Sequence, residues 1–470
     1  MAVTQGRPSR AARLAGAWRS GPLSVPGFRL LAVGQFTSAI GDYCYAVALP
    51  WLVLSDGGSA ASLGVVLACY GIPRALLTVP GGSLADRFSP RLVMLSADFA
   101  RCALTVVFVV LAATHTSSLA AVAPVAVLLG SCSALFMPAS MAMMPSLVDS
   151  SRLTSANSVY ASFVQVGSML GPAIGGVLVA TTGPATAFAV DAGSYLVSAA
   201  SLAFISVTGP KQAGAVPGAA DDLTAEEAAI ALAAADGTAP EEAAVALAIA
   251  GHPAPEPAAP VSAASAPGSV WQLLRQSRLL QIILVVVLSA NFALVGTTEV
   301  ALPALAHARF GADGYGAVLT CVAVAALVGA LVVGKLGDRF LPVVLIAGSL
   351  LVAAAAIAAA PFIGGLPGVA AGMAVFGIAT GFDNVVSITL IQRWAPPALL
   401  GRVWGLLTLA SVGSFPVATF IAGLLVHHLG PTPVFPISGA LLALSMIYGL
   451  TQREFRDFGR EDTEQSPIPA

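Results

Sequence analysis

The chain has 470 residues, of which 57% are hydrophobic and 9% are charged, and its mean hydropathy is +0.88. A soluble domain is about 25% charged, so this composition excludes an ordinary water-soluble protein and indicates one that lies in a lipid bilayer. The formal net charge of −2 identifies no partner, and we expect no nucleic acid to bind.

Twelve apolar runs follow one another, each near the roughly 20 residues that cross the hydrocarbon layer. They must be helices, because lipid offers no partner to unpaired backbone groups. The sequence therefore predicts an all-α integral membrane protein with twelve transmembrane helices in two pseudo-symmetric six-helix bundles. The predicted spans are 28–54, 62–84, 92–113, 119–140, 155–180, 184–207, 280–305, 314–335, 341–361, 367–391, 402–427 and 432–450.

Basic residues set the predicted orientation. Of the 21 Lys and Arg residues, only Arg309 falls in a predicted outer loop, and Arg74 and Arg101 lie within apolar runs. All the others fall on one side, which the positive-inside rule assigns to the cytoplasm. We therefore expect both termini in the cytoplasm. We also expect a multi-pass protein of the inner or plasma membrane that works as a monomer.

The segments outside the two bundles differ from them in composition. Residues 1–27 are basic and lack a cleavable signal pattern, so we expect a cytoplasmic tail. Residues 28–208 are the predicted first bundle. Residues 209–278 are rich in Ala, Pro and acidic residues, which favours a largely flexible cytoplasmic loop. Residues 279–451 are the predicted second bundle, and the charged tail 452–470 is expected to be disordered.

Several ionisable side chains lie inside the predicted first bundle. Asp42 lies near mid-membrane, where a carboxylate costs about 2.5–3.5 kcal/mol on insertion, so it indicates a proton or substrate site, or a helix-packing acid. Arg74 either faces a cavity or pairs with a neighbouring acid. Asp98 and Arg101 share one helical face and are expected to neutralise each other or the charged segment at 82–88. Asp191, near the outer end of its run, is expected to be solvated.

A short charged segment occurs twice, at Gly82–Phe88 and Gly334–Phe340, in matching places of the two halves. Such a repeat indicates internal duplication. A carboxylate such as Asp86 is stabilised near a helix N-terminus, and the start of the eleventh run is a candidate anchor. We therefore predict a conformational latch; the alternative is an ordinary positive-inside loop. Its predicted members are Gly82, Asp86, Arg87, Arg91, Gly334, Asp338, Arg339 and Arg402.

The fifth run carries a glycine motif made of Gly167, Gly171, Pro172, Gly175 and Gly176. Glycines at spacing four form a smooth helical face that lets another backbone approach closely. Pro172 adds a kink. An ordinary helix-packing face is the alternative.

The second half contains two further intramembrane acids, Glu299 and Asp383. With Asp42, they are three of the acids within the predicted membrane runs. Asn291 and Asn384, together with Arg74, are candidates for the substrate cavity. The apolar runs contain no HExxH or GxSxG motif, so an enzyme, a metal site and a cofactor are not expected.

The two halves and the repeated charged segment resemble those of the major facilitator superfamily, and the resemblance covers essentially the whole chain. The family pattern between helices two and three is matched at Gly82, Leu84, Ala85, Asp86, Arg87 and Arg91, while Ser89 and Pro90 replace the usual Gly and basic residue. The second copy matches at Gly334, Leu336, Asp338 and Arg339.

The fifth-run motif resembles that of drug:proton antiporters. The macrolide-efflux and enterobactin-exporter branch is similar at Pro138, Pro145, Leu147, Val148, Ala156, Asn157 and Gly401-Arg402-Val403. The arginine that many such antiporters carry in the fourth run is absent, so the resemblance leaves Asp42, Glu299 and Asp383 as the candidates for proton coupling by default. The resemblance implies proton-coupled export of an amphiphilic small molecule such as a drug, macrolide or siderophore. Uptake or facilitated transport of a metabolite, or a receptor or scaffold without transport, remain the alternatives.

Overall fold

The computed structural model describes residues 21–55, 57–149, 152–205, 274–275, 277–336, 342–395 and 397–458. Throughout these residues the regular structure is helical. Eleven of the helices are long and apolar enough to cross a membrane. The predicted all-α membrane fold is thus confirmed.

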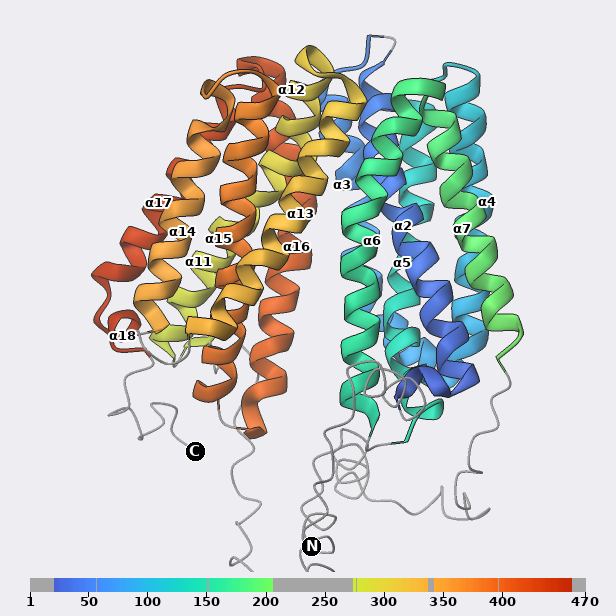
Figure 1. Cartoon of the computed structure of the whole chain (residues 1–470), viewed down its shortest axis with the longest axis horizontal. Helices are drawn as coiled ribbons and strands as arrows, with labels where there is room; N and C mark the ends of the chain where they lie inside the picture. The colour runs from blue at the N-terminus through green and yellow to red at the C-terminus, as the bar shows by residue number, and fades with distance from the viewer. Residues whose placement is uncertain are drawn as a thin grey trace, which may run out of the picture. The chain divides into compact units, whose positions relative to one another are not determined.

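The first bundle contains a short 3-10 turn η1 and six long helices, drawn from blue to green in Figure 1. Helices α4 and α7 have proline in their first turn, where its fixed φ suits a helix and its missing N–H costs nothing. The elements are η1 (Pro22–Ser24), α2 (Pro26–Leu54), α3 (Ala60–Arg87), α4 (Pro90–Ala113), α5 (Leu119–Met143), η2 (Met144–Ser146), α6 (Leu153–Thr182) and α7 (Pro184–Ala203).

The second bundle follows the same plan, drawn from yellow to red in Figure 1, but its first membrane crossing is interrupted by a π-helical turn. The predicted run 280–305 is therefore built from three consecutive pieces. The elements are α11 (Arg278–Val295), the π-helical turn η4 (Gly296–Ala301), α12 (Leu302–Arg309), α13 (Gly311–Leu336), α14 (Pro342–Ala359), η6 (Ala360–Phe362), α15 (Gly365–Trp394), α16 (Pro397–Leu429), α17 (Val434–Thr451) and α18 (Arg453–Arg456).

Helix α7 occupies the predicted sixth run but is not among the eleven apolar candidates. Its 20 residues include Asp191 and a series of serines. This helix packs against α2 and α4, and these polar residues are buried inside the bundle. Helix α7 is therefore less hydropathic than these eleven helices because it carries buried polar residues that face the bundle interior.

The two bundles show matching internal packing, as a duplicated chain should. Helix α3 packs on α5, and α13 packs on α15. In each pair a glycine of the later helix sits against a carbonyl of the earlier one: Gly130 lies against Tyr70 O, and Gly381 against Ala326 O. Large apolar side chains such as Leu76 and Leu444 are exposed on the outside, as expected where lipid rather than water is the solvent.

Both bundles belong to one compact unit, and α3 contacts α16 while α6 contacts α13. Two close approaches lie near the beginnings of α3 and α13, which meet the ends of α16 and α6 respectively. A Cβ built on Gly64 would lie 2.9 Å from the Cα of Gly423, and one on Gly176 would lie 3.0 Å from the Cα of Gly316. Near them, Trp51 stacks on Tyr315 with ring centroids 5.8 Å apart.

Candidate functional site

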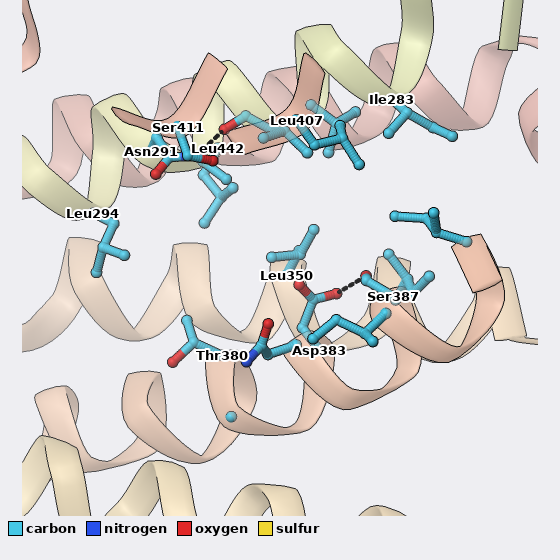
Figure 2. Close-up of a pocket in the computed structure, with 18 of the residues that line it drawn as sticks. Ile283, Asn291, Leu294, Leu350, Thr380, Asp383, Ser387, Leu407, Ser411 and Leu442 are labelled. Atoms are coloured by element: carbon cyan, nitrogen blue, oxygen red, sulfur yellow. Dashed lines mark hydrogen bonds between the residues drawn. The ribbon is translucent and has the colours of Figure 1, made fainter. Parts of the chain in front are cut away.

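A cavity of about 600 Å³ lies inside the second bundle (Figure 2). This volume suits a small organic molecule. Most of its lining is aliphatic or aromatic, with a few polar groups contributed mainly by α15 and α16. Residues that line it include Ile283, Val287, Leu294, Leu350, Phe376 and Leu407.

The polar groups of the cavity form two hydrogen-bonded pairs on opposite sides of it (Figure 2). On one side, Asn291 Nδ2 donates to Ser411 Oγ at 3.3 Å and to Val287 O at 2.9 Å. On the other, Ser387 Oγ donates to Asp383 Oδ1 at 3.3 Å. Asn384 also lines the cavity. Three of the predicted site residues, Asn291, Asp383 and Asn384, are therefore brought together here.

Two aromatic residues that follow α17 also line the cavity. Phe455 of α18 and Phe458 line it and are only 3% and 6% exposed. Phe458 packs edge-on against Trp394 with ring centroids 5.8 Å apart. The expectation that everything after Thr451 is disordered was wrong for residues 452–458, because this charged stretch contains two phenylalanines that the bundle buries.

In the first bundle, Asp42 lies on α2 and is half-buried. Tyr195 of α7 donates a hydrogen bond of 2.6 Å from its hydroxyl to Asp42 Oδ1. Tyr195 is itself only 3% exposed. A hydrogen bond to an ionised group is worth about 1.5–3 kcal/mol, so this bond holds the Asp42 carboxylate in place.

Beside this bond, Arg101 makes a buried ion pair with Asp98, one turn away on α4. The guanidinium also lies between two aromatic rings, with the Phe136 centroid at 4.2 Å and the Tyr195 centroid at 4.4 Å. Such cation–π contacts stabilise a desolvated guanidinium by about 2 kcal/mol. The sequence-based expectation that Asp98 and Arg101 pair with each other agrees with this geometry.

Asp191 belongs to the same region, and the expectation that it is solvated was wrong. Its exposed fraction is 0%, and neither carboxylate oxygen has a hydrogen-bond partner. Thr105 and Ser194 flank it, but the Ser194 hydroxyl donates to the backbone carbonyl of Asp191 at 2.7 Å. Asp191 faces α2: a Cβ on Gly41 would lie 2.7 Å from its Oδ1.

Glu299 and Arg74, two of the predicted site residues, are not among the residues that line the cavity of the second bundle. Arg74 on α3 is exposed; it donates to the Tyr70 hydroxyl at 3.4 Å. Glu299 is part of the π-helical turn, a local form that occurs often at functional sites. The charges of Glu299 and Arg74 are close enough to interact, so the two side chains connect the bundles electrostatically.

The glycine motif of α6 contacts two different helices. Cβ atoms added to Gly167, Gly171 and Gly175 would overlap α2 at Ala39, Tyr43 and Cys44 respectively. Gly176, on the other side of the helix, lies against α13 of the second bundle. Pro172 is buried within the helix. The motif therefore packs α6 within its own bundle and against the other one.

The predicted latch is only partly within the described residues. Gly82 and Asp86 belong to the last turns of α3, so this segment is helical rather than a loop. Arg87 is exposed. Arg91 donates to the carbonyls of Leu202 and Ala203 at 2.8 and 2.5 Å, which ties α4 to the end of α7. Gly334 and Arg402 lie in α13 and α16, while Asp338 and Arg339 lie outside the described residues.

Several residues of these sites were missed by sequence reasoning. Tyr195, Phe136 and Ser387 are common residue types that stand out only once the helices are packed. One signal was present for α7: Asp191, Ser194, Tyr195, Ser198 and Ser201 recur every three or four positions. That spacing puts them on one face of a helix, which marks a buried polar stripe.

Comparison with known proteins places this geometry in context. A family model described as the Major Facilitator Superfamily matches residues 31–316 and 298–468. The multidrug efflux pump Tap of Mycolicibacterium fortuitum is 31% identical over 169 residues, which are 35% of this chain and 41% of that protein. The staphyloferrin A transporter of Staphylococcus aureus is 28% identical over 159 residues, 34% of this chain and 40% of that protein. The alignments thus span about two fifths of these relatives.

Solved structures share the fold at low sequence identity. A bacterial homologue of the iron transporter ferroportin, in an inward-facing state, gives a TM-score of 0.65 at 14% identity, covering 93% of this chain and 99% of that one. A POT family transporter in complex with a thioalcohol-conjugated peptide gives 0.66 at 14% identity, covering 90% and 95%.

Proposed function

Since the chain belongs to the Major Facilitator Superfamily, we propose that it is a secondary transporter that exports an amphiphilic small molecule across the plasma membrane in exchange for protons. The cavity of the second bundle carries this proposal. It is large enough for a drug-sized molecule, and a mostly apolar wall surrounds one carboxylate and two amides.

The chemistry of the cavity favours an apolar molecule that bears a positive charge or hydrogen-bond donors. Apolar surface supplies affinity at about 25 cal/mol per Å² buried. Asp383 is held by one hydrogen bond of 3.3 Å from Ser387, so its other oxygen can accept a bond from the ligand. A carboxylate in such surroundings favours cationic ligands over uncharged ones, because an uncharged ligand would leave the negative charge of Asp383 without a partner.

Alternating access supplies the transport step. In transporters built from repeats, two bundles rock about a central site. With the termini in the cytoplasm, the Gly64–Gly423 and Gly176–Gly316 contacts close the outer side. In this state the substrate would enter from the cytoplasm, which is the loading step of an exporter. Asp42, Glu299 and Asp383 are the candidate proton carriers, and Arg74, Asn291 and Asn384 are the candidate substrate contacts.

Vesicles of known sidedness test the direction of transport. In inside-out vesicles with an acidic interior, export predicts that an amphiphilic cationic dye accumulates inside, and that Asp383→Asn reduces this accumulation. Uptake predicts accumulation in right-side-out vesicles instead, and that result would overturn the export proposal. A receptor or scaffold predicts movement in neither orientation. The relatives named multidrug efflux pump Tap and staphyloferrin A transporter indicate the first compounds to try.

A further inference from the structure

The first bundle buries more negative than positive charge. Among the described residues, Asp42, Asp98 and Asp191 lie together with a single cation, Arg101. If all four were ionised, the cluster would carry two uncompensated negative charges in a region that excludes water. Burying even one unpaired carboxylate is so costly that such a group normally becomes neutral instead.

The contacts show which of the three acids lacks compensation. Asp98 has Arg101 as an ion-pair partner. Asp42 is half-buried and accepts the 2.6 Å hydrogen bond from Tyr195. Asp191 is 0% exposed, and neither of its oxygens has a hydrogen-bond partner.

We propose that Asp191 is a proton-binding site, and that its carboxyl group holds a proton in the packing described above. Binding forms an O–H bond on one carboxylate oxygen. Release breaks that bond and returns H⁺ to water, while the electron pair stays on the carboxylate. The new negative charge is compensated only in part, because the nearby guanidinium of Arg101 is already paired with Asp98, so the carboxylate readily takes up a proton again. A proton suits this site better than a metal ion, because the cluster already contains a fixed cation.

The hydroxyl groups of Thr105 and Ser194 flank Asp191, and the titratable groups around it come from the helices packed against α7. Helices α2, α4 and α6 pack against α7. The ionisable residue of α6 is Tyr160, which accepts a hydrogen bond from Ser140 rather than facing Asp191. The titratable groups whose charges reach Asp191 are Asp42, Cys44 and Tyr45 of α2, Arg101 and Cys102 of α4, and Tyr195 of α7.

The packing also gives the site one-sided access. Toward the end with the interbundle contacts, three aromatic rings close the bundle: Tyr45 lies 5.6 Å from Phe108 and 5.5 Å from Phe188, and the two phenylalanines are 5.3 Å apart. Both phenylalanines are 0% exposed. Asp42 is half-buried, whereas Asp98 and Asp191 are 0% exposed, so Asp42 is the acid of the cluster that solvent reaches. Protons therefore reach Asp191 by way of Asp42, and the aromatic layer blocks leakage along the bundle.

That this proton drives export rests on the proposed function. The substrate cavity lies in the other bundle, so a substitution at Asp191 should uncouple transport without removing substrate binding. In proteoliposomes, Asp191→Asn should lose at least nine tenths of gradient-driven transport and keep its substrate Kd within about twofold. Tyr195→Phe, which removes the bond to Asp42 and leaves Asp191 in place, should retain part of the driven transport.

Infrared spectroscopy of the purified full-length protein in lipid vesicles tests the site without any substrate. A protonated carboxylic acid has a carbonyl-stretch band distinct from that of a carboxylate, and it shifts in D₂O. The proposal predicts such a band at neutral pH, lost in Asp191→Asn and retained in Asp191→Glu. Asp149→Asn, at an exposed position outside the bundle, is the control and should leave the band unchanged.

The possible outcomes separate the proton site from the transport function. The site is overturned if the wild-type protein shows no such band, or if the band survives in Asp191→Asn and disappears in Asp42→Asn. If Asp191→Asn does not fold, the pH titration of the band in the wild type and in Asp191→Glu decides instead. A wild-type protein with the Asp191 band but without proton-driven transport would refute the proposed function and leave the site standing.

Discussion

The contact between Gly64 and Gly423 makes a quantitative prediction about the equilibrium between transporter states. A Cβ on Gly64 would lie 2.5 Å from Thr419 O and 2.9 Å from Gly423 Cα. Both atoms belong to the α16 backbone, so the helices must move apart. Overpacking of this kind costs about 1–3 kcal/mol.

The cost applies only to the state in which α3 and α16 touch. Alanine raises the helix propensity of α3 equally in both states, so the propensity change cancels. Gly64→Ala should therefore shift the population toward the state with separated helix ends by about 5- to 150-fold, since 1.4 kcal/mol corresponds to a factor of ten. Gly176→Ala, at the equivalent contact with α13, should shift the population in the same direction.

The assay is the distance distribution between spin labels on the ends of α3 and α16 next to the contact. Gly413→Ala is the matched control, because a Cβ at Gly413 of α16 meets no atom within 4 Å. If Gly64→Ala and Gly413→Ala give the same distribution, the glycine contact does not close the protein at this end, and the reasoning fails.

Three further substitutions test the two clusters and the C-terminal segment. Asp383→Asn should weaken the binding of a cationic amphiphile by about 10- to 100-fold, because a hydrogen bond to a charged group contributes about 1.5–3 kcal/mol. A fluorescence titration measures the Kd of the cation. An unchanged Kd would show that Asp383 does not contact the cation. Asp42→Asn should abolish proton-driven efflux at normal expression, as vesicle assays can measure, and wild-type efflux would exclude Asp42 from coupling. Phe455→Ala should lower the free energy of unfolding by about 3 kcal/mol, because it empties a buried aromatic site. Phe362→Ala, which removes a ring that is 65% exposed, is the control and should change the melting temperature little. Equal changes in melting temperature for the two variants would contradict the packing of α18.

Most of the fold could be predicted because the bilayer leaves few alternatives. A membrane-spanning segment must be helical and of nearly fixed length, so the apolar runs alone locate the helices. The predicted run 155–180 corresponds to α6, Leu153–Thr182, and the run 367–391 to α15, Gly365–Trp394. Proline and glycine between the runs set the ends: Gly183 has φ 84°, which favours glycine, and Pro184 begins α7.

The rotation of each helix about its axis was harder to predict. Lipid is as apolar as the bundle interior, so apolar side chains surround a transmembrane helix on all sides and do not show which face is buried. Asn291 and Asn384 were predicted to line a cavity because amide groups avoid lipid, and both line the cavity of the second bundle. Asp191 was assigned to solvent from its position near a helix end, and only its packing against Gly41 shows that it faces inward.

The central claim is that an imposed proton gradient drives substrate through this protein in the opposite direction. The most direct measurement uses purified protein in liposomes of known sidedness, with substrate at equal concentration on both sides and a pH gradient imposed. The account predicts that substrate accumulates on the acidic side while protons leave it, that a protonophore abolishes the accumulation, and that Asp191→Asn prevents both fluxes. Accumulation that persists with the protonophore, or that proceeds without proton movement, would contradict it.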